Sequence, residues 1–221
     1  MTEGYFVTGT DTDVGKTELT LGLMAALQAR GKQVLGMKPV AAGCDWQQGR
    51  LVNADALRIQ RQCSRPLVYE MINPIALEPA IAPHLAAAEA GVEISFDAIL
   101  RPYQALRQQT DWLIVEGAGG WRVPLGRDGD MGDLAQRLGL PVILVVGMRL
   151  GCLNHALLSL AAIQAQGCPL AGWVANGIDP RMQRLEQNLA SLEALIPAPC
   201  LGRIAYMQPP TPERIAPMID L

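Results

Sequence analysis

The stretch YFVTGTDTDVGKT, residues 5–17, indicates both the fold and a phosphate-binding site. A short apolar segment leads into a turn rich in Gly, Thr and Asp, and a Leu- and Ala-rich segment follows Gly15, Lys16 and Thr17. This is the layout of a P-loop, in which main-chain N–H groups of the turn and the N-terminus of the following helix bind phosphate oxygens. We expect Lys16 to reach the β- and γ-phosphates of a nucleotide and the Thr17 hydroxyl to hold Mg²⁺.

The spacing of this loop departs from the standard pattern. Five residues separate Gly9 from Gly15, where the usual P-loop has four, so we expect the loop to follow a longer path. The alternative is an ordinary strand–turn–helix that carries Gly-Lys-Thr by chance. The apolar segment before the turn and the helical pattern after it favour the P-loop.

Composition favours one α/β domain that spans residues 1–221. The chain has 50% hydrophobic and only 5% aromatic residues, and its formal net charge is −3. A chain of this length can bury a large core, and its Ala, Leu, Val and Ile content suits helices packed on a parallel sheet. No basic stripe points to a nucleic-acid partner.

The sequence also predicts a cytoplasmic protein without a membrane partner. The N-terminal residues enter the first apolar strand directly, without a signal-peptide pattern, and no apolar run reaches the roughly 18 residues of a membrane helix. The five cysteines are odd in number and contain no C-x-x-C pair, which favours reduced core thiols over disulfides or zinc ligands.

Apolar strands alternate with amphipathic helices along most of the chain. Nearly continuous apolar runs such as 141–147 are typical of strands covered on both faces. The sequence therefore predicts a doubly wound, mainly parallel sheet with helices on both faces, whose ligands gather at the carboxyl ends of the strands. The predicted strands are 5–8, 34–38, 112–116, 142–147, 171–176 and 200–204, and the predicted helices are 16–30, 53–62, 84–90, 95–109, 132–138, 152–166 and 181–196.

Three segments are expected to be irregular. The connections 40–52 and 66–83 are long, and long loops are commonly functional or mobile. The tail 208–221 contains four prolines, and we expect it to wrap the surface.

Charged residues stand where two predicted strands end. Lys38 closes the second strand, so it is either a second cation beside the P-loop or an ordinary surface lysine; two cations in one pocket suit a reaction with crowded negative charge. Glu116 closes the strand 112–116, which is the layout of a Walker-B metal ligand, although Asp is more usual there. The glycines at 117, 119 and 120 would let the backbone approach phosphates or substrate.

Other polar positions leave two interpretations open. Asp55, in Asn53-Ala54-Asp55, is either part of a helix cap or a metal ligand. The turn 151–155 is either a plain helix start or a place where free N–H groups hold a carboxylate. Asn176, at the end of a strand, could hydrogen-bond a base edge. Only His84 and His155 are histidines, and neither lies in a motif with a nucleophile, so a hydrolase triad is a poor interpretation.

In their order along the chain, these segments resemble those of the dethiobiotin synthetase family, the ATP-dependent ring-forming enzymes of biotin biosynthesis. That family shares the five-residue spacing of the P-loop. The similarity extends from residue 5 to about residue 206, and the combination of motifs is highly specific. The matching segments are 9–17, Lys38-Pro39-Val40, Asn53-Ala54-Asp55, Asn73-Pro74, Pro83-His84, 115–121, 151–155 and 172–176.

The resemblance implies a homodimer that uses ATP and Mg²⁺ to carboxylate 7,8-diaminononanoate and close a cyclic urea. It implies Mg²⁺ held by Thr17, Asp55 and Glu116, and it implies catalytic roles for Lys16, Lys38 and Thr12. Substrate contacts would come from Lys38, Ala42, Gly151, Cys152, Leu153 and Asn154, the last four across the dimer interface. Nucleotide contacts would come from Asp13, Val14, Gly15, Lys16, Thr17, Glu18, Glu116, Gly117, Ala118, Gly119, Asn176, Gly177, Ala205 and Tyr206.

One departure from the family and two rival functions remain. Family members often have a hydroxyl residue where this chain has Ala42, so one substrate hydrogen bond is in question. A cobyrinate-type amidating ligase would need a glutaminase domain, for which this chain has neither the length nor a motif. A partition- or metallochaperone-type ATPase switch is the main alternative, although residues 10–12 lack the extra lysine that many such switches carry.

Overall fold

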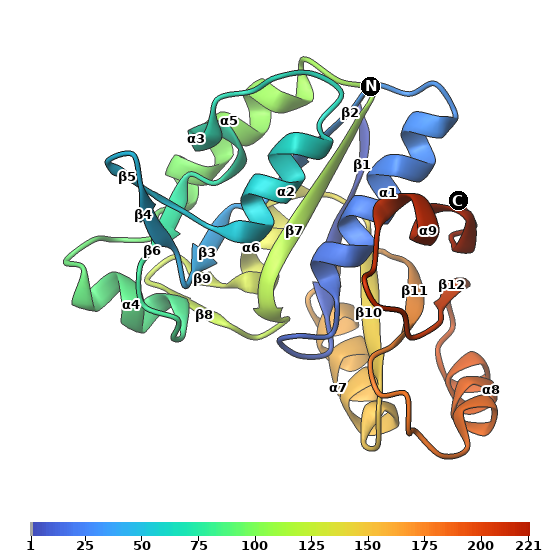
Figure 1. Cartoon of the computed structure of the whole chain (residues 1–221). Coiled ribbons are helices and arrows are strands. Elements are labelled where there is room, and N and C mark those ends of the chain that lie inside the picture. Colours follow the sequence, from blue (N-terminus) through green and yellow to red (C-terminus); the bar gives the residue numbers. More distant parts are fainter. Residues whose placement is uncertain (1) are drawn as a thin grey trace.

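A six-stranded parallel sheet forms the centre of the protein (Figure 1). The computed structural model describes residues 2–221, and the strand order within them is β12-β11-β10-β1-β7-β2. All neighbouring strands pair in parallel, which confirms the predicted doubly wound sheet. The strands are β1 (Glu3–Gly9), β2 (Val34–Met37), β7 (Trp112–Gly120), β10 (Val142–Met148), β11 (Leu170–Gly177) and β12 (Cys200–Ile204).

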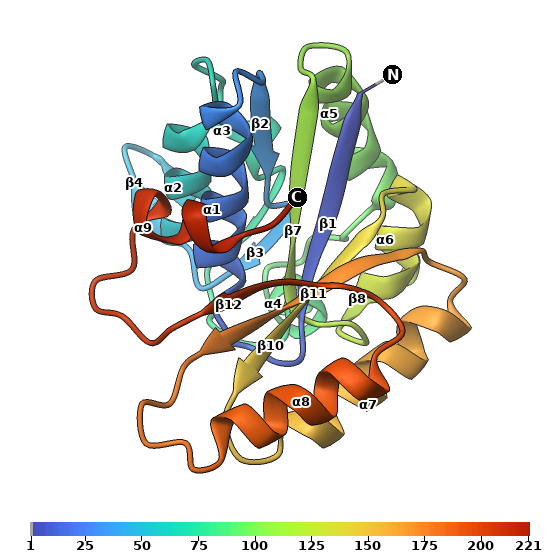
Figure 2. The same cartoon turned by 90° about the vertical axis from the view of Figure 1, so that its right-hand side faces the viewer.

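Helices cover both faces of this sheet because both faces are apolar (Figure 2). Consecutive strand residues point to opposite sides, so Phe6 packs into one core and Val7 into the other. The helices over the Val7 side are α1 (Lys16–Ala29), α2 (Ala54–Gln62), α3 (Tyr69–Ile72) and α9 (Pro212–Ile215). Those over the Phe6 side are α4 (Pro83–Glu89), α5 (Phe96–Arg107), α6 (Met131–Leu138), α7 (Cys152–Ala165) and α8 (Leu185–Leu195).

Two predicted boundaries were wrong by four residues. Strand β7 does not end at Glu116 but continues to Gly120, because β1 continues beside it and Gly9 lies opposite Gly120. Helix α8 begins at Leu185 rather than at 181, since Arg184 has a left-handed backbone (φ 57°) that is incompatible with a helix interior.

The two long connections are also more regular than predicted. Segment 40–52 contains β3 (Val40–Ala42) and a hairpin of β4 (Asp45–Gln47) and β5 (Arg50–Val52). Segment 66–83 contains α3 and β6 (Ile75–Leu77), and β6 pairs in parallel with β3. A second small hairpin, β8 (Pro124–Gly126) and β9 (Gly129–Asp130), follows β7. These short elements are hard to predict because three-residue strands carry almost no periodicity.

The tail does not simply wrap the surface, as we had predicted. It forms α9 and the 3₁₀ helix η1 (Ala216–Met218), and the side chains of Ile215 and Ile219 are buried against α1. The tail can approach this closely because residue 22 of α1 is glycine: a Cβ there would lie 2.4 Å from Cγ2 of Ile215. Within residues 2–221, no helix is both long enough and apolar enough to cross a bilayer.

Candidate active site

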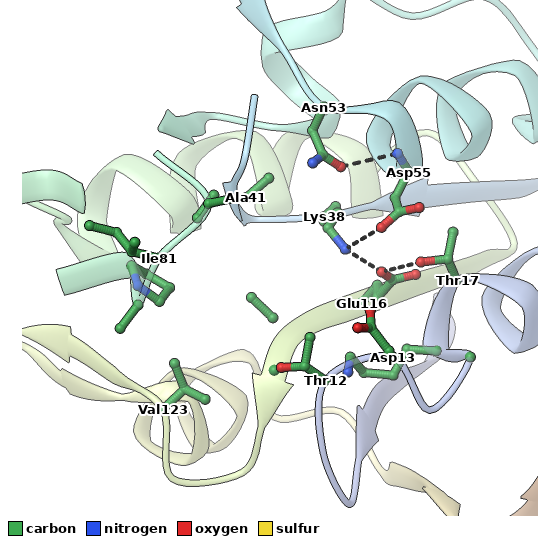
Figure 3. Close-up of a pocket in the computed structure, with 18 of the residues that line it drawn as sticks. Thr12, Asp13, Thr17, Lys38, Ala41, Asn53, Asp55, Ile81, Glu116 and Val123 are labelled. Carbon is green, nitrogen blue, oxygen red and sulfur yellow. Dashed lines mark hydrogen bonds and ion pairs between the residues drawn. The ribbon is translucent and has the colours of Figure 1, made fainter. Parts of the chain in front are cut away.

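A cavity of about 770 Å³ opens at the carboxyl edge of the sheet, beside the P-loop. Five parts of the chain line it: the P-loop and first turn of α1, segment 38–42, the start of α2, segment 80–83 at the start of α4, and segment 116–123 with the second half of β7. In Figure 3 the charged residues Lys38, Asp55 and Glu116 lie together, while Ala41, Ile81 and Val123 lie farther along the cavity. The cavity therefore has a charged part next to α1 and a more apolar part next to α4.

The P-loop is braced by the neighbouring strand β11. Gly15 caps α1 with a left-handed backbone (φ 86°), and a Cβ at this position would lie 2.1 Å from Nδ2 of Asn176. That amide nitrogen donates a 2.8 Å hydrogen bond to the carbonyl of Val14. Nζ of Lys16 turns back to the carbonyl of Asp11 at 2.8 Å. The loop thus uses its own lysine and one strand-end amide to hold its shape.

A cluster of opposite charges surrounds Glu116, whose side chain is fully buried in β7. Its Oε1 atom accepts a 2.8 Å hydrogen bond from the hydroxyl of Thr17 and an ion pair from Nζ of Lys38. The same ammonium group lies 3.3 Å from Oδ2 of Asp55 (Figure 3). Lys38 is therefore a buried residue with two carboxylate partners, and not an ordinary surface lysine.

A buried hydrogen-bond network positions Lys38 and α2. Asn53 is the cap of α2, since its side chain accepts from the N–H groups of Asp55 and Ala56. Asp55 is thus not the cap residue, and its carboxylate is directed to Lys38. The hydroxyl of Tyr69 accepts from the N–H of Asn53 and donates to Oδ1 of Asn73, whose amide donates to the carbonyl of Lys38.

The two lysines of the cavity have different electrostatic surroundings. Burial lowers the pKa of Lys16 to about 8; the charge of Lys38 acts in the same direction and the charge of Glu116 opposes it. Burial also acts to lower the pKa of Lys38, but the carboxylates of Glu116 and Asp55 outweigh it and raise this pKa. Lys38 therefore stays an ammonium group at neutral pH, whereas Lys16 lacks such close partners and is the more easily deprotonated of the two.

The oxygen atoms around Glu116 are suited to Mg²⁺. Oε2 of Glu116 is buried and has no hydrogen-bond partner among residues 2–221, and a buried polar atom without a partner is unusual. In the same part of the chain, no three His, Cys, Asp or Glu side chains converge on one point. Two carboxylates and a hydroxyl nevertheless match Mg²⁺, which prefers hard oxygen ligands and keeps waters or phosphate oxygens for the other positions.

The structure brings most of the predicted site residues to this one cavity, and separates two other groups from it. The residues that line it are Thr12, Asp13, Gly15, Lys16, Thr17, Glu18, Lys38, Ala42, Asp55, Glu116, Ala118 and Gly119. Asn176 contacts the P-loop from the end of β11, and Ala205 and Tyr206 follow β12 beside Gly177; a Cβ at Gly177 would be 2.8 Å from the N atom of Tyr206. Residues 151–154 begin α7 and do not line the cavity.

Sequence reasoning missed several lining residues. They are Ala41, Asn53, Ala80, Ile81, Ala82, Pro83 and Val123. Most are small or apolar, so residue chemistry does not mark them as part of a site. Two signals were available: the length of segment 66–83, noted only as a long connection, and the family resemblance, whose matching segments include Asn53 and Pro83 without a site role.

The fold and this cavity define the class of the protein as a P-loop nucleotide-binding protein. A family profile described as an AAA domain matches residues 3–214. The structure is also similar to the septum site-determining protein MinD from Pyrococcus horikoshii in complex with Mg-ADP, at 14% identity and a TM-score of 0.59 over 100% of this chain and 87% of that one. A ParA family ATPase from Chlorobium tepidum gives the same identity and TM-score over 99% and 91%. At this identity the similarity concerns the fold alone.

Sequence comparison identifies the family. The chain is 54% identical to ATP-dependent dethiobiotin synthetase BioD from Pseudomonas aeruginosa strain PAO1, over 98% of this chain and 96% of that protein. It is 51% identical to the protein of the same name from Cellvibrio japonicus, over 99% and 96%, and 48% identical to that from Aromatoleum aromaticum, over 100% and 99%. The chain belongs to the ATP-dependent dethiobiotin synthetase family.

Proposed function

We propose that this protein, acting as one P-loop domain, converts 7,8-diaminononanoate, CO₂ and ATP to dethiobiotin, ADP and phosphate. The observation that carries this proposal is the pair of buried ammonium groups, Lys16 and Lys38, at one cavity beside a P-loop. The reaction brings two anions together, and a cavity with two cations is suited to that task. The names of the relatives, at about half identity over nearly the full chain, support the same reaction.

The first step needs positive charge more than it needs a nucleophile from the protein. One amine of the substrate attacks the carbon of CO₂ and loses a proton, which gives a carbamate anion. A carbamate oxygen then attacks the γ-phosphorus of ATP, and ADP leaves. Lys38 stays charged in its carboxylate surroundings, so it can pair with the carbamate, and Lys16 with the phosphates.

The second step closes the ring. The carbamic–phosphoric anhydride has a good leaving group, so the second amine attacks its carbonyl carbon, phosphate departs and a proton is lost. The substrate amine is itself the nucleophile, which fits a site without a Ser, Cys or His in a nucleophilic motif. Thr12, at the tip of the P-loop and on the cavity wall, is suited to hold a reacting oxygen by its hydroxyl.

Mg²⁺ would be held by Thr17, Asp55 and Glu116. When bound there, the ion would neutralise charge on the β- and γ-phosphates. Lys38 contacts both of these carboxylates in this structure, so its ammonium group lies directly beside the residues that would hold the ion. The unpartnered Oε2 atom of Glu116 supports this assignment.

For the nucleotide, we propose that the P-loop holds the phosphates and that residues 176, 177, 205 and 206 surround the base. Asn176 supports this because its amide contacts the P-loop at the end of the sheet where ligands of such folds bind, and Tyr206 lies beside Gly177, the residue that follows Asn176. The amide nitrogen of Asn176 donates one of its two hydrogens to Val14, so its second N–H and its oxygen are available to a base.

The substrate carboxylate is assigned to residues 151–154 of a second copy of the chain. These residues begin a 14-residue helix and do not line the cavity of their own chain. Leu150, just before them, is 97% exposed, and Leu158 on the same helix is 63% exposed. In a homodimer built on the start of this helix, the second copy would cover these two leucines.

The reaction is tested by measuring ADP release with the diamine and bicarbonate together and with each omitted. Release that requires both, with dethiobiotin formed in equal amount by mass spectrometry, supports the proposal. ATP hydrolysis that ignores the diamine would instead favour a nucleotide switch. The dimer is tested by sedimentation, and by mixing an inactive Lys38→Ala protein with an inactive Asn154→Asp protein: mixed dimers with shared sites recover activity.

A further inference from the structure

A bidentate ion pair joins the first turn of α1 to α2 at the edge of the cavity. Nη1 of Arg58 donates to Oε1 of Glu18 at 2.6 Å, and Nη2 donates to Oε2 at 2.8 Å. This geometry is the strongest that arginine and a carboxylate can form. The side chain of Glu18 is 21% exposed and that of Arg58 is 35% exposed, so the pair is partly shielded from water.

The position of Glu18 needs explanation in a nucleotide site. Glu18 follows Thr17 directly and lines the same cavity. A carboxylate in the first turn of a helix is favourable to the helix dipole. Beside a triphosphate, however, the same carboxylate would repel the ligand unless a cation neutralises it.

Arg58 is placed to be that cation. It lies one turn after Asp55 on α2, and α1 and α2 lie side by side on one face of the sheet (Figure 2). The pKa of Arg58 is raised, first by its hydrogen bonds with Glu18, and the carboxylates of Asp55 and Glu116 contribute to the same shift. Its charge therefore interacts favourably with these three carboxylates.

We propose that Arg58 is a positioning residue, which draws the Glu18 carboxylate toward α2 and neutralises it, so that the triphosphate can bind beside it. The proposal rests on the nucleotide site proposed above. Arg58 does not line the cavity and touches no proposed ligand, so it acts only through Glu18.

If Arg58 acts by neutralising Glu18, loss of Arg58 and loss of Glu18 should affect nucleotide affinity differently. In Arg58→Gln, the Glu18 carboxylate loses its partner beside the triphosphate, and we expect about ten-fold weaker binding of ADP with Mg²⁺. In Glu18→Gln, the repelling carboxylate is removed while the Arg58 cation remains, and we expect ADP to bind about two-fold more tightly than to the wild type. In the double variant Glu18→Gln/Arg58→Gln, we expect the affinity lost in Arg58→Gln to return. Isothermal titration calorimetry with ADP and Mg²⁺ measures all three.

Arg127→Gln provides the matched control, because Arg127 is paired only loosely with Glu93 (3.9 Å) on an exposed hairpin. It should bind ADP like the wild type. A purely structural ion pair would make both single variants bind equally weakly, with no recovery in the double variant, and that result would overturn the proposal. If Arg58→Gln does not fold, Glu18→Gln still tests the proposal. A ten-fold loss of ADP affinity in Glu18→Gln would contradict neutralisation of Glu18 by Arg58. Failure of the wild type to bind ADP would instead refute the nucleotide site itself.

Discussion

The hydroxyl of Thr17 donates a 2.8 Å hydrogen bond to Oε1 of Glu116, across 99 residues of sequence. This contact joins the first turn of α1 to the middle of β7, the two elements that carry the phosphate loop and the buried acid. Because Glu116 also contacts Lys38, which in turn contacts Asp55, four residues from four segments form one charged centre.

Lys38→Ala should lower turnover by about 100-fold or more, the effect of one lost electrostatic donor in an active site. ADP affinity should change little, since the phosphates are assigned to the P-loop. Steady-state rates and calorimetry check the two parts separately. Normal turnover by this variant would exclude Lys38 from the mechanism.

Lys38→Met tests the link between Lys38 and the metal. It removes the ammonium group but keeps the length of the side chain, so buried Glu116 loses its ionic partner; loss of one member of a buried pair costs about 3–5 kcal/mol. Millimolar Mg²⁺ should recover part of this loss and should raise the melting temperature of the variant more than that of the wild type. Equal stabilisation of both proteins by Mg²⁺ would contradict a shared site.

Gly15→Ala should abolish tight ADP binding and destabilise the fold by about 1–3 kcal/mol. The residue has a positive φ, and the new Cβ would lie 2.1 Å from Nδ2 of Asn176, so backbone strain and a steric clash act together. Gly31→Ala is the matched control: its φ is also positive, at 76°, but nothing lies within 4 Å of the added Cβ. It should cost only about 1 kcal/mol and leave ADP binding unchanged.

Ile215→Ala tests the role of the tail. Ile215 is fully buried against α1, and truncation of a buried Ile to Ala typically costs about 2–5 kcal/mol. Leu195→Ala, at a residue that is 51% exposed, should change the unfolding free energy by less than about 1 kcal/mol. Urea denaturation measures both, and equal small effects would mean that the tail contributes no packing energy.

The thiol of Cys63 should make stability depend on pH in the alkaline range. Burial raises its pKa to about 11 from the usual 9.0, so the folded state favours the neutral thiol. The contribution of the neutral thiol to the unfolding free energy is fully present below pH 9 and is lost as the pH rises toward 11. In Cys63→Ala, the fall in unfolding free energy between pH 9 and 11 should be smaller by about 1–2 kcal/mol, allowing for partial exposure. Denaturation curves measured at each pH give the unfolding free energies. An equal fall in the two proteins would show that the Cys63 thiol does not cause the pH dependence.

The parallel sheet was predictable because its strands are long apolar runs separated by helical periodicity, as in 141–147. The charged end of the cavity was predictable too, since Lys16, Lys38, Asp55 and Glu116 each stand at the end or start of a recognisable element. The apolar end was not: Ile81 and Val123 reach the cavity through short strands and turns whose position depends on tertiary pairing, such as that of β3 with β6. Ile215 is buried because Gly22 of α1 leaves space for it. The two residues are far apart in the sequence, so local periodicity does not predict this contact.

The ammonium group of Lys38 serves as a built-in counter-ion for the two carboxylates assigned to the metal. Because this cation already balances their charge, we expect the protein to fold without a divalent ion. Treatment with a chelator should accordingly abolish dethiobiotin formation without changing the circular dichroism spectrum. A metal-free preparation should regain its activity when Mg²⁺ is added.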